Sequence, residues 1–218
     1  MVVRFSSVFS LVLTFFFLSA CEDKSVERKS LGSRGPSGSE VRDIGPFDGI
    51  VALGPTLTTI SKGPLSKLEL KGPENYLSSV TTRVEEREVA GGARRVLVVE
   101  LNERIEFPRV ELSLTVPDLA YVEANRASQI KMGDFSRQDL TIRADFGGRI
   151  ELAPAAYGSV DIEVAKVARV VGKEVMVEKA KLRAYGPSLI LLGQVAEAVN
   201  EAVSPARISY QGRYDSKK

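Results

Sequence analysis

The chain has 218 residues, 44% of them apolar, and its 30 Lys and Arg residues nearly balance its 28 Asp and Glu residues. This balance gives no basis for a nucleic-acid surface, which needs basic residues clustered on one face. With no histidine and one cysteine, the chain lacks the groups for Ser-His-Asp or Cys-His catalysis and for the usual zinc sites. We expect one folded domain, with no nucleic-acid partner, no metal and no cofactor.

The first twenty residues are predicted to be a signal peptide. Arg4 gives a positive start, and residues 8–20, VFSLVLTFFFLSA, carry no charge. This run is shorter than the ~20 apolar residues of a membrane-spanning helix, and it has the apolar centre of a secretory signal. Its end, LSAC at residues 18–21, resembles the bacterial lipobox. That resemblance implies cleavage before Cys21 and lipid on its thiol. The alternative is an ordinary secretory signal followed by a free thiol.

Residues 21–40 are predicted to be a lipid-anchored tether. They are rich in Ser, Gly and charged residues and almost free of apolar ones, so they cannot support a core. Several acyl chains would hold the protein stably on a membrane without spanning it. The membrane is therefore an expected partner, and we expect a place in the cell envelope, on the outer membrane rather than the inner. Whether the protein faces the periplasm or the cell surface is left open.

From Val41 onward the sequence predicts a mostly β domain. Short alternating runs at 47–53, 56–61, 67–71, 94–101 and 109–116 are separated by Gly, Pro and Asn, as is typical of strands and turns. One segment, Gly193–Val203, also fits a short helix that caps one end. A core-facing extended segment is the equal alternative.

Four gapless repeats of twenty residues start at Leu119, Asp139, Ser159 and Lys179. Four aligned columns are wholly apolar, sixteen positions where composition alone predicts about seven. A fixed period of this size indicates a stacked repeat, and each unit reads as two strands joined by a corner. The columns are Ala120, Leu140, Val160, Ala180; Val122, Ile142, Ile162, Leu182; Ala124, Ala144, Val164, Ala184; and Ile130, Ile150, Val170, Ile190.

A period near twenty suits the rung of a β-solenoid, in which coils lie ~4.8 Å apart and equal columns point inward. One outward column alternates in charge and reads Glu123, Arg143, Glu163, Arg183. In register, each charge would neighbour its counter-ion. We interpret this column as a solvated charge ladder, with a charged substrate groove as the alternative.

The triplet Asp145-Phe146-Gly147 matches the magnesium-binding motif of protein kinases, but a kinase also needs a His-Arg-Asp loop, and the chain has no histidine. The repeat register places Asp145 to Gly148 at a corner instead. We therefore predict a bend between two strands and no metal ligand.

Several motifs resemble the GIN-type head domain of the "putative auto-transporter adhesin" family. The likeness runs from about 41 to 214 and leaves 215–218 as a tail. It implies a lipoprotein or secreted protein of the cell envelope built as a right-handed parallel β-helix, and our first hypothesis is that this protein is non-catalytic. The corners NRAS, DFGG, AKVA and YGPS depart from the family's S-G-A-S corner, and only the last keeps both glycine and serine, at Gly186 and Ser188. The matching positions are Phe47, Ile50, Gly72, Asn75, Pro117, Leu119, Ile208, Tyr210 and Gly212.

Three functions remain open: a binding or adhesion surface for a polysaccharide or envelope protein, a polysaccharide-acting enzyme, and a structural scaffold joined to its partner through an end of the solenoid. An enzyme would need two convergent carboxyl groups. The candidates are Asp139, Asp145, Asp161 and Glu163, which we interpret as solvated strand positions. We predict no catalytic residue. Likewise, Tyr121, Tyr157 and Tyr185 are interpreted as packing residues rather than sugar-stacking ones, and no ligand-binding residue is assigned.

Overall fold

A computed structural model describes residues 36–89, 92–102 and 110–212, with no statement on the side chain of Gln138. The predicted signal peptide, Cys21 and the predicted tail of residues 215–218 lie outside the described residues. The tether is predicted to be a flexible linker as far as residue 40. Its last residues instead belong to strand β1, Ser37–Arg42, which pairs with β4. Among the described residues, no helix is long and apolar enough to cross a membrane.

The all-β prediction is confirmed, because the described residues form fifteen strands of a single sheet and one helix of four residues. The helix, α1, covers Glu74–Leu77. The strands are β1 (Ser37–Arg42), β2 (Gly49–Leu53), β3 (Thr56–Lys62), β4 (Lys67–Pro73), β5 (Val80–Val89), β6 (Gly92–Leu101), β7 (Val110–Val116), β8 (Tyr121–Asn125), β9 (Gln129–Met132), β10 (Arg137–Ala144), β11 (Arg149–Leu152), β12 (Ala156–Ala165), β13 (Arg169–Tyr185), β14 (Leu189–Val203) and β15 (Arg207–Gln211).

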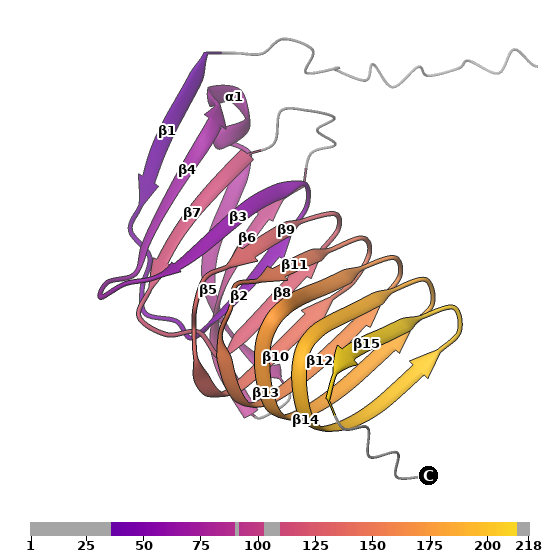
Figure 1. Ribbon diagram of the computed structural model, residues 1–218. Coiled ribbons are helices and arrows are strands. Elements are labelled where there is room, and N and C mark those ends of the chain that lie inside the picture. The colour runs from indigo at the N-terminus through magenta and orange to yellow at the C-terminus, as the bar shows by residue number, and fades with distance from the viewer. Residues whose placement is uncertain (1–35, 90–91, 103–109, 213–218) are drawn as a thin grey trace, which may run out of the picture. The chain divides into compact units, whose positions relative to one another are not determined.

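The sheet has two arms that meet at β13. One arm runs β5-β6-β2-β8-β10-β12 and the other β1-β4-β7-β3-β9-β11. The first half of β13 pairs with β11 and its second half with β12. Figure 1 shows how the chain winds from one arm to the other and back, so that successive turns of the chain lie side by side.

The predicted register is the observed one. Ile142 pairs with Val122 on one side and with Ile162 on the other, and Ile162 pairs with Leu182, always in parallel and twenty residues apart. All sixteen residues of the four apolar columns are buried. A strand's side-chain period of two gives this result only when the register is correct, so the repeat alignment is confirmed residue by residue.

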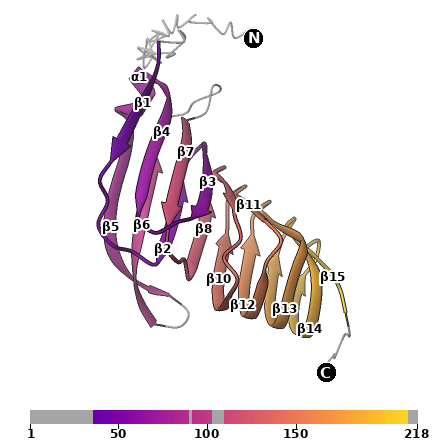
Figure 2. The ribbon, with the colours of Figure 1, turned by 60° about the vertical axis from the view of Figure 1, so that its left-hand side comes forward.

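The first coil along the chain, β2 followed by β3, lies inside the stack. Strand β2 pairs with β6 on one side and β8 on the other, and β3 lies between β7 and β9. Figure 2 shows β2 and β3 within the row of strands. The order of coils in space therefore differs from their order in the sequence.

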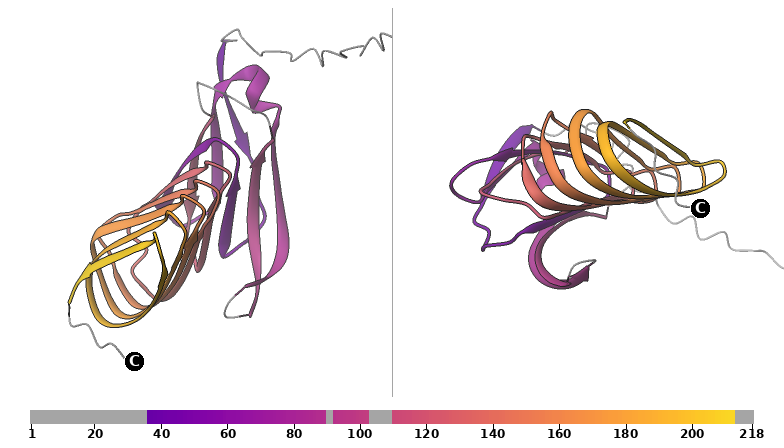
Figure 3. Two further views of the ribbon diagram at one scale, coloured as in Figure 1. Left: turned by 90° about the vertical axis from the view of Figure 1, so that its right-hand side faces the viewer. Right: turned by 60° about the horizontal axis from the view of Figure 1, so that its bottom comes forward.

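Antiparallel strands close the end of the sheet where β5 and β1 lie. Strand β5 pairs with β6 across the two residues 90–91, and a connection this short allows only a hairpin. Strands β4 and β7 also run antiparallel. The β5–β6 hairpin curls outward (Figure 3), and a small cluster of Val51, Val96, Val98 and Tyr121 is buried there, separate from the main core.

Three of the predicted corners are turns and the last is a bend, and the second residue of each has a backbone in the left-handed region. Phe146 has a φ of 44° and Gly147 one of 78°. The matching pair of the next corner, Lys166 and Val167, has 48° and 70°. Asp145 accepts a hydrogen bond from the Phe146 amide at 2.8 Å and pairs with Lys166 at 3.2 Å. The kinase-like triplet is thus a bend, as predicted.

The helix considered for Gly193–Val203 is wrong, because these residues belong to strand β14. Val195 and Ala198 are buried, whereas Val199 and Val203 are exposed. The spacing between partners falls from twenty residues at Gly172–Leu192 to eighteen at Met176–Gln194. A bulge in β13 absorbs the difference, and the last full coil is two residues shorter than the others.

Candidate functional site

An open groove of about 1090 Å³ runs along the stack where the second arm turns back into the first. It begins near Ser136 and Arg137 and ends at Gln211 and Gly212. Successive coils contribute equivalent positions to it, since Ala156, Met176, Gln194 and Gln211 are paired in turn across β12, β13, β14 and β15. The groove therefore runs across the strands rather than along one of them.

The floor beneath the groove consists of apolar side chains that are closed to solvent. Tyr157, Val177 and Val195 are buried and lie on three successive coils in register. Ala156 lies beside Tyr157 and is exposed. The floor belongs to the same buried cluster as the core, so its shape is set by the packing of the coils.

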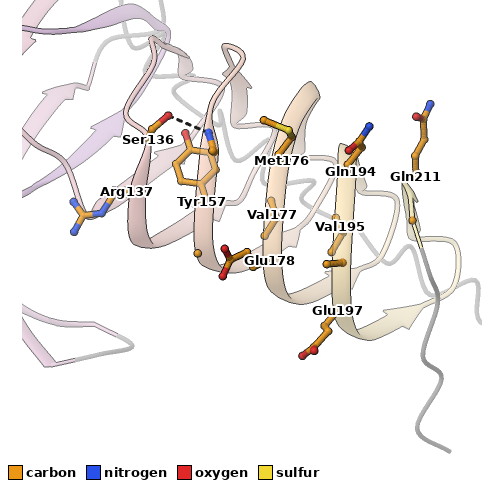
Figure 4. A pocket seen from close by; sticks show the side chains of 14 residues that line it. Ser136, Arg137, Tyr157, Met176, Val177, Glu178, Gln194, Val195, Glu197 and Gln211 are labelled. Atoms are coloured by element: carbon orange, nitrogen blue, oxygen red, sulfur yellow. Dashed lines mark hydrogen bonds between the residues drawn. The ribbon is translucent and has the colours of Figure 1, made fainter.

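Two different rims flank this floor (Figure 4). Ser136, Met176, Gln194 and Gln211 project to one side. Glu178 and Glu197 lie on the other, whereas Arg137 is in register with Tyr157 between the two rims. One rim therefore offers hydroxyl, thioether and amide groups. The other carries two exposed carboxylates.

Two polar atoms at the Ser136 end are buried without a hydrogen-bond partner among the described residues. They are the hydroxyl oxygen of Tyr157 and Nε of Arg137, and the two residues are direct cross-strand partners. Arg137 uses Nη1 to bind Asp118 at 2.9 Å, which leaves Nε unused. Burial, together with the negative charge of Asp134, raises the pKa of the Tyr157 hydroxyl to about 12. Tyr157 is thus a neutral hydroxyl at physiological pH.

The charge ladder is formed in part. Glu163 contacts Arg143 at 3.1 Å and Arg183 at 3.2 Å, and Arg183 also binds Asp161 at 2.6 Å. Glu123 is engaged differently, because it accepts a hydrogen bond from Tyr121 at 2.7 Å and lies 3.6 Å from Arg87 of the curled hairpin. These contacts give each acidic residue of the ladder a basic neighbour.

The four candidate carboxylates do not form one catalytic pair in the groove. Asp161 and Glu163 are both held by Arg183, while Asp145 is held by Lys166 at a corner. Asp139 is exposed and lies opposite Ser159. None of the four lines the groove. In the part of the chain that the structure describes, no three His, Cys, Asp or Glu side chains gather as a metal site.

The tyrosines are largely packing residues, as predicted. Tyr121 and Tyr157 are each only 2% exposed, so neither ring offers a face to a sugar. Tyr185 is half-buried at a corner.

Sequence reasoning missed the groove itself. A usable signal was present in Ser136, Ala156 and Met176, which are twenty residues apart at the second corner of each coil. Gln194 and Gln211 fall outside that period because the last coils are shorter. Cys21, the one site residue that the sequence assigns, lies outside the described residues.

These features define a class: an all-β protein whose parallel strands pair in steps of twenty residues, with a surface groove across them in the described residues. Residues 46–213 match the family described as "Putative auto-transporter adhesin, head GIN domain". The chain belongs to this family, as the motif resemblance indicated. None of the functionally curated proteins compared with the chain matches it.

Solved structures with similar folds include three described as putative adhesins. One from Parabacteroides distasonis has a TM-score of 0.67 at 16% identity, covering 80% of this chain and 73% of its own. One from Parabacteroides merdae has a TM-score of 0.63 at 13% identity, covering 82% and 92%. A third, from Bacteroides fragilis, has 0.60 at 11% identity, covering 81% and 94%. At these identities the likeness concerns the fold alone.

Proposed function

We propose that this chain is a non-catalytic, lipid-anchored protein of the bacterial cell envelope that binds an external partner through the groove, in the manner of an adhesin. The groove is the observation that carries the proposal, because successive coils of the repeat contribute equivalent positions to it. The family description and the names of the similar structures support an adhesin-like role at the envelope. Similarity of fold alone would not support a functional proposal, since proteins with one fold can have many different functions.

The fold that presents the groove is proposed to be the right-handed parallel β-helix of the family. The parallel pairing of β8, β10, β12 and β13 in steps of twenty residues supports it. In such a stack a groove across the coils is rigid, because each coil is hydrogen-bonded to its neighbours. A rigid surface binds with little ordering cost.

The anchor is proposed to be lipid on Cys21, at the end of the LSAC motif. We predict that Cys21→Ala moves the protein from the membrane pellet to the soluble fraction of lysed cells, because the variant has no thiol to acylate. Cys21→Ser is the matched control for thiol loss with a side chain of nearly equal size, and it should behave in the same way. A variant that stays with membranes would show that the chain is held by something other than this lipid.

The binding role is tested by adhesion of cells that express the wild-type chain to surfaces coated with envelope polysaccharides or with proteins. Ala196→Trp places a large ring in the groove at an exposed alanine, and we expect it to abolish adhesion at unchanged protein levels. Ala202→Trp makes the same change at an exposed alanine that does not line the groove and should adhere like wild type. Equal adhesion by both variants would refute the groove as the binding site.

A polysaccharide-acting enzyme is the second candidate, since Glu178 and Glu197 lie on one rim and glycoside hydrolysis uses two carboxyl groups ~5 to 10 Å apart. Both side chains are exposed, whereas a general acid needs an environment that keeps it protonated near neutral pH. We therefore favour binding without turnover. Release of new reducing ends from any polysaccharide, lost in Glu178→Gln, would favour the enzyme.

A further inference from the structure

We propose that one side of the stack rests on a membrane surface that contains anionic phospholipid, so that the groove faces away from the membrane. This inference rests on the proposed function, because it adds an orientation of the groove to the proposed lipid anchor. The membrane-facing side is a row of corners and their flanking arginines, which we call the corner ridge. It consists of Arg126, Phe146, Arg149, Lys166, Val167 and Arg169.

The corner ridge and the groove lie at opposite ends of the first-arm strands. Strand β12 begins at Ala156 and Tyr157, which line the groove, and ends at Ala165, beside the corner of Lys166 and Val167. At ~3.3 Å per residue, the stretch from Tyr157 to Ala165 spans about 26 Å. Figure 1 shows the corners that follow β10, β12 and β14 in a row along one side of the coils. A surface that contacts this row therefore leaves the groove accessible.

The corner ridge carries two large apolar side chains that are exposed to solvent. Phe146 is 54% exposed and Val167 is 57% exposed. Their backbones are left-handed, with φ of 44° and 70°, which is unfavourable for a bulky or β-branched residue. Burial offsets little of this cost, and residues with such backbones cluster at functional sites. Exposed apolar side chains on a row of corners are suited to insertion among lipid headgroups.

Two arginines beside these corners form no ion pair among the described residues. Arg149 and Arg169 are exposed and are direct cross-strand partners, although like charges placed opposite each other are destabilising. Glu151, on the same face as Arg149, lies opposite Lys131 of the neighbouring coil. A phosphate group can accept hydrogen bonds from two guanidinium groups at once. The arginine pair therefore favours a partner that carries phosphate.

The corners themselves add two cations. Lys166 lies 3.8 Å from the centroid of the Phe146 ring and 3.2 Å from a carboxylate oxygen of Asp145. Arg126 is paired with Glu100. The four cations of the ridge less these two carboxylates leave a surplus of two positive charges. Cations beside exposed apolar side chains are typical of surfaces that bind anionic lipid.

The shape of the corner ridge favours a lipid surface over a soluble acidic chain. None of its six residues lines the groove, and its corners lie on successive coils, ~4.8 Å apart. An acidic polymer would contact the cations but would leave Phe146 and Val167 in water. A phospholipid surface offers phosphate to the arginines and an apolar layer to these two side chains.

The test uses residues 21–218, the whole predicted mature chain, with Cys21→Ala so that no acyl chain of its own holds it to a membrane. Sedimentation measures its partition into vesicles of phosphatidylcholine alone and of phosphatidylcholine mixed with phosphatidylglycerol. We expect at least tenfold stronger partition into the anionic vesicles at low salt, and loss of this preference at high salt. Equal partition into both kinds of vesicle at low salt would overturn the inference.

Soluble anions decide between a lipid surface and an acidic polymer. Polyphosphate, oligogalacturonate and an oligoglutamate peptide are added as competitors at equal concentrations of charge. We expect the protein to bind each of them more weakly than the anionic vesicles, because none covers the apolar side chains. Tighter binding of any one of them would overturn the inference in favour of that polymer.

Two double variants locate the charge contact. Arg149→Gln with Arg169→Gln should weaken partition into anionic vesicles about 25-fold, or about fivefold for each cation removed. Lys173→Gln with Lys179→Gln removes the same charge at exposed positions outside the ridge and should weaken it about twofold at most. Equal losses in both would mean that vesicles attract the net charge of the chain, and the assigned ridge would be wrong.

Phe146→Asn removes the ring but keeps a residue that tolerates the left-handed region. It should weaken partition about tenfold without lowering the midpoint of urea unfolding. Val199→Asn is the matched control at an exposed apolar residue outside the ridge, and it should partition like the parent chain. Unchanged partition of Phe146→Asn would refute insertion at this corner.

Quenching by brominated phosphatidylglycerol measures the orientation. The Cys21→Ala chain has no other cysteine, so Pro187→Cys at a corner and Ala196→Cys in the groove each provide one exposed labelling site. A fluorophore at residue 187 should be quenched, and one at residue 196 should not. Quenching at residue 196, or at neither position, would refute the proposed orientation.

The outcomes separate this inference from the proposed function. If partition does not depend on the ridge but adhesion is still abolished by Ala196→Trp, the orientation is wrong and the adhesin-like role stands. If the ridge binds anionic vesicles but adhesion is insensitive to Ala196→Trp, the membrane contact stands and the groove is not the adhesive surface.

Discussion

At the corners of the coils, single residues adopt left-handed backbone conformations that are unfavourable for most side chains. At the third position of the corner, two successive coils carry Gly147, with φ 78°, and Val167, with φ 70°. A β-branched side chain is unfavourable in this region, by roughly 1 to 2 kcal/mol for the general left-handed case. Glycine has no such penalty. The Val167 side chain is 57% exposed, so it recovers little through burial.

We predict that Val167→Gly raises the free energy of unfolding by about 1 kcal/mol, because relief of the left-handed strain outweighs the larger backbone entropy of glycine in the unfolded chain. Urea denaturation measures the change. Val199→Gly is the matched control, since Val199 is 67% exposed on strand β14. It should lose about 0.5 to 1 kcal/mol. Loss of stability in both variants would mean that Val167 is not strained.

At the scale of the elements, cross-strand charges link neighbouring coils. Arg143 lies between Glu123 and Glu163 in register, and Glu163 also contacts Arg183. The side chains of Arg143 and Glu163 are 35% and 33% exposed, so solvent and salt weaken each contact. The ladder therefore adds modest stability and mainly specifies register.

We predict that Arg143→Glu lowers the free energy of unfolding by about 1 kcal/mol, since it exchanges attraction for repulsion on both sides. Adding Glu163→Arg should restore only part of this loss, because residue 163 would then face Arg183. Thermal melts at low and high salt measure both effects, and high salt should shrink them.

Arg149→Glu is the control for this exchange, because the cross-strand neighbours of Arg149 are Gln129 and Arg169. It should not destabilise the protein. Strictly additive effects of Arg143→Glu and Glu163→Arg would argue against contact between them.

For the whole molecule, stacking makes each coil depend on its neighbours, as in other repeat proteins. Ile162 is fully buried in a central coil, whereas Ile208 of β15 is half-buried at the end of the stack. A cavity between two coils weakens both interfaces. The same change at the last strand weakens one.

We predict that Ile162→Ala lowers the free energy of unfolding by about 3 kcal/mol and Ile208→Ala by about 1 kcal/mol. Hydrogen exchange should show that the two variants open in different ways. Ile162→Ala should speed exchange across all coils through global unfolding, and Ile208→Ala mainly in β15 and β14. Equal losses from the two changes would indicate that the stack has no weak end.

The sequence by itself determined the repeat, its twenty-residue register, the inward columns and the corner around Asp145. In stacked coils, equivalent positions lie above one another, so the same kinds of residue recur at a fixed spacing in the sequence. It also carried the family motifs. The tertiary structure decided what has no period: the central place of the β2–β3 coil, the antiparallel hairpin over Tyr121, the extended state of Gly193–Val203 and the groove beside Tyr157. These depend on which distant segments pack together, and the local pattern of a strand is the same whichever neighbour it pairs with.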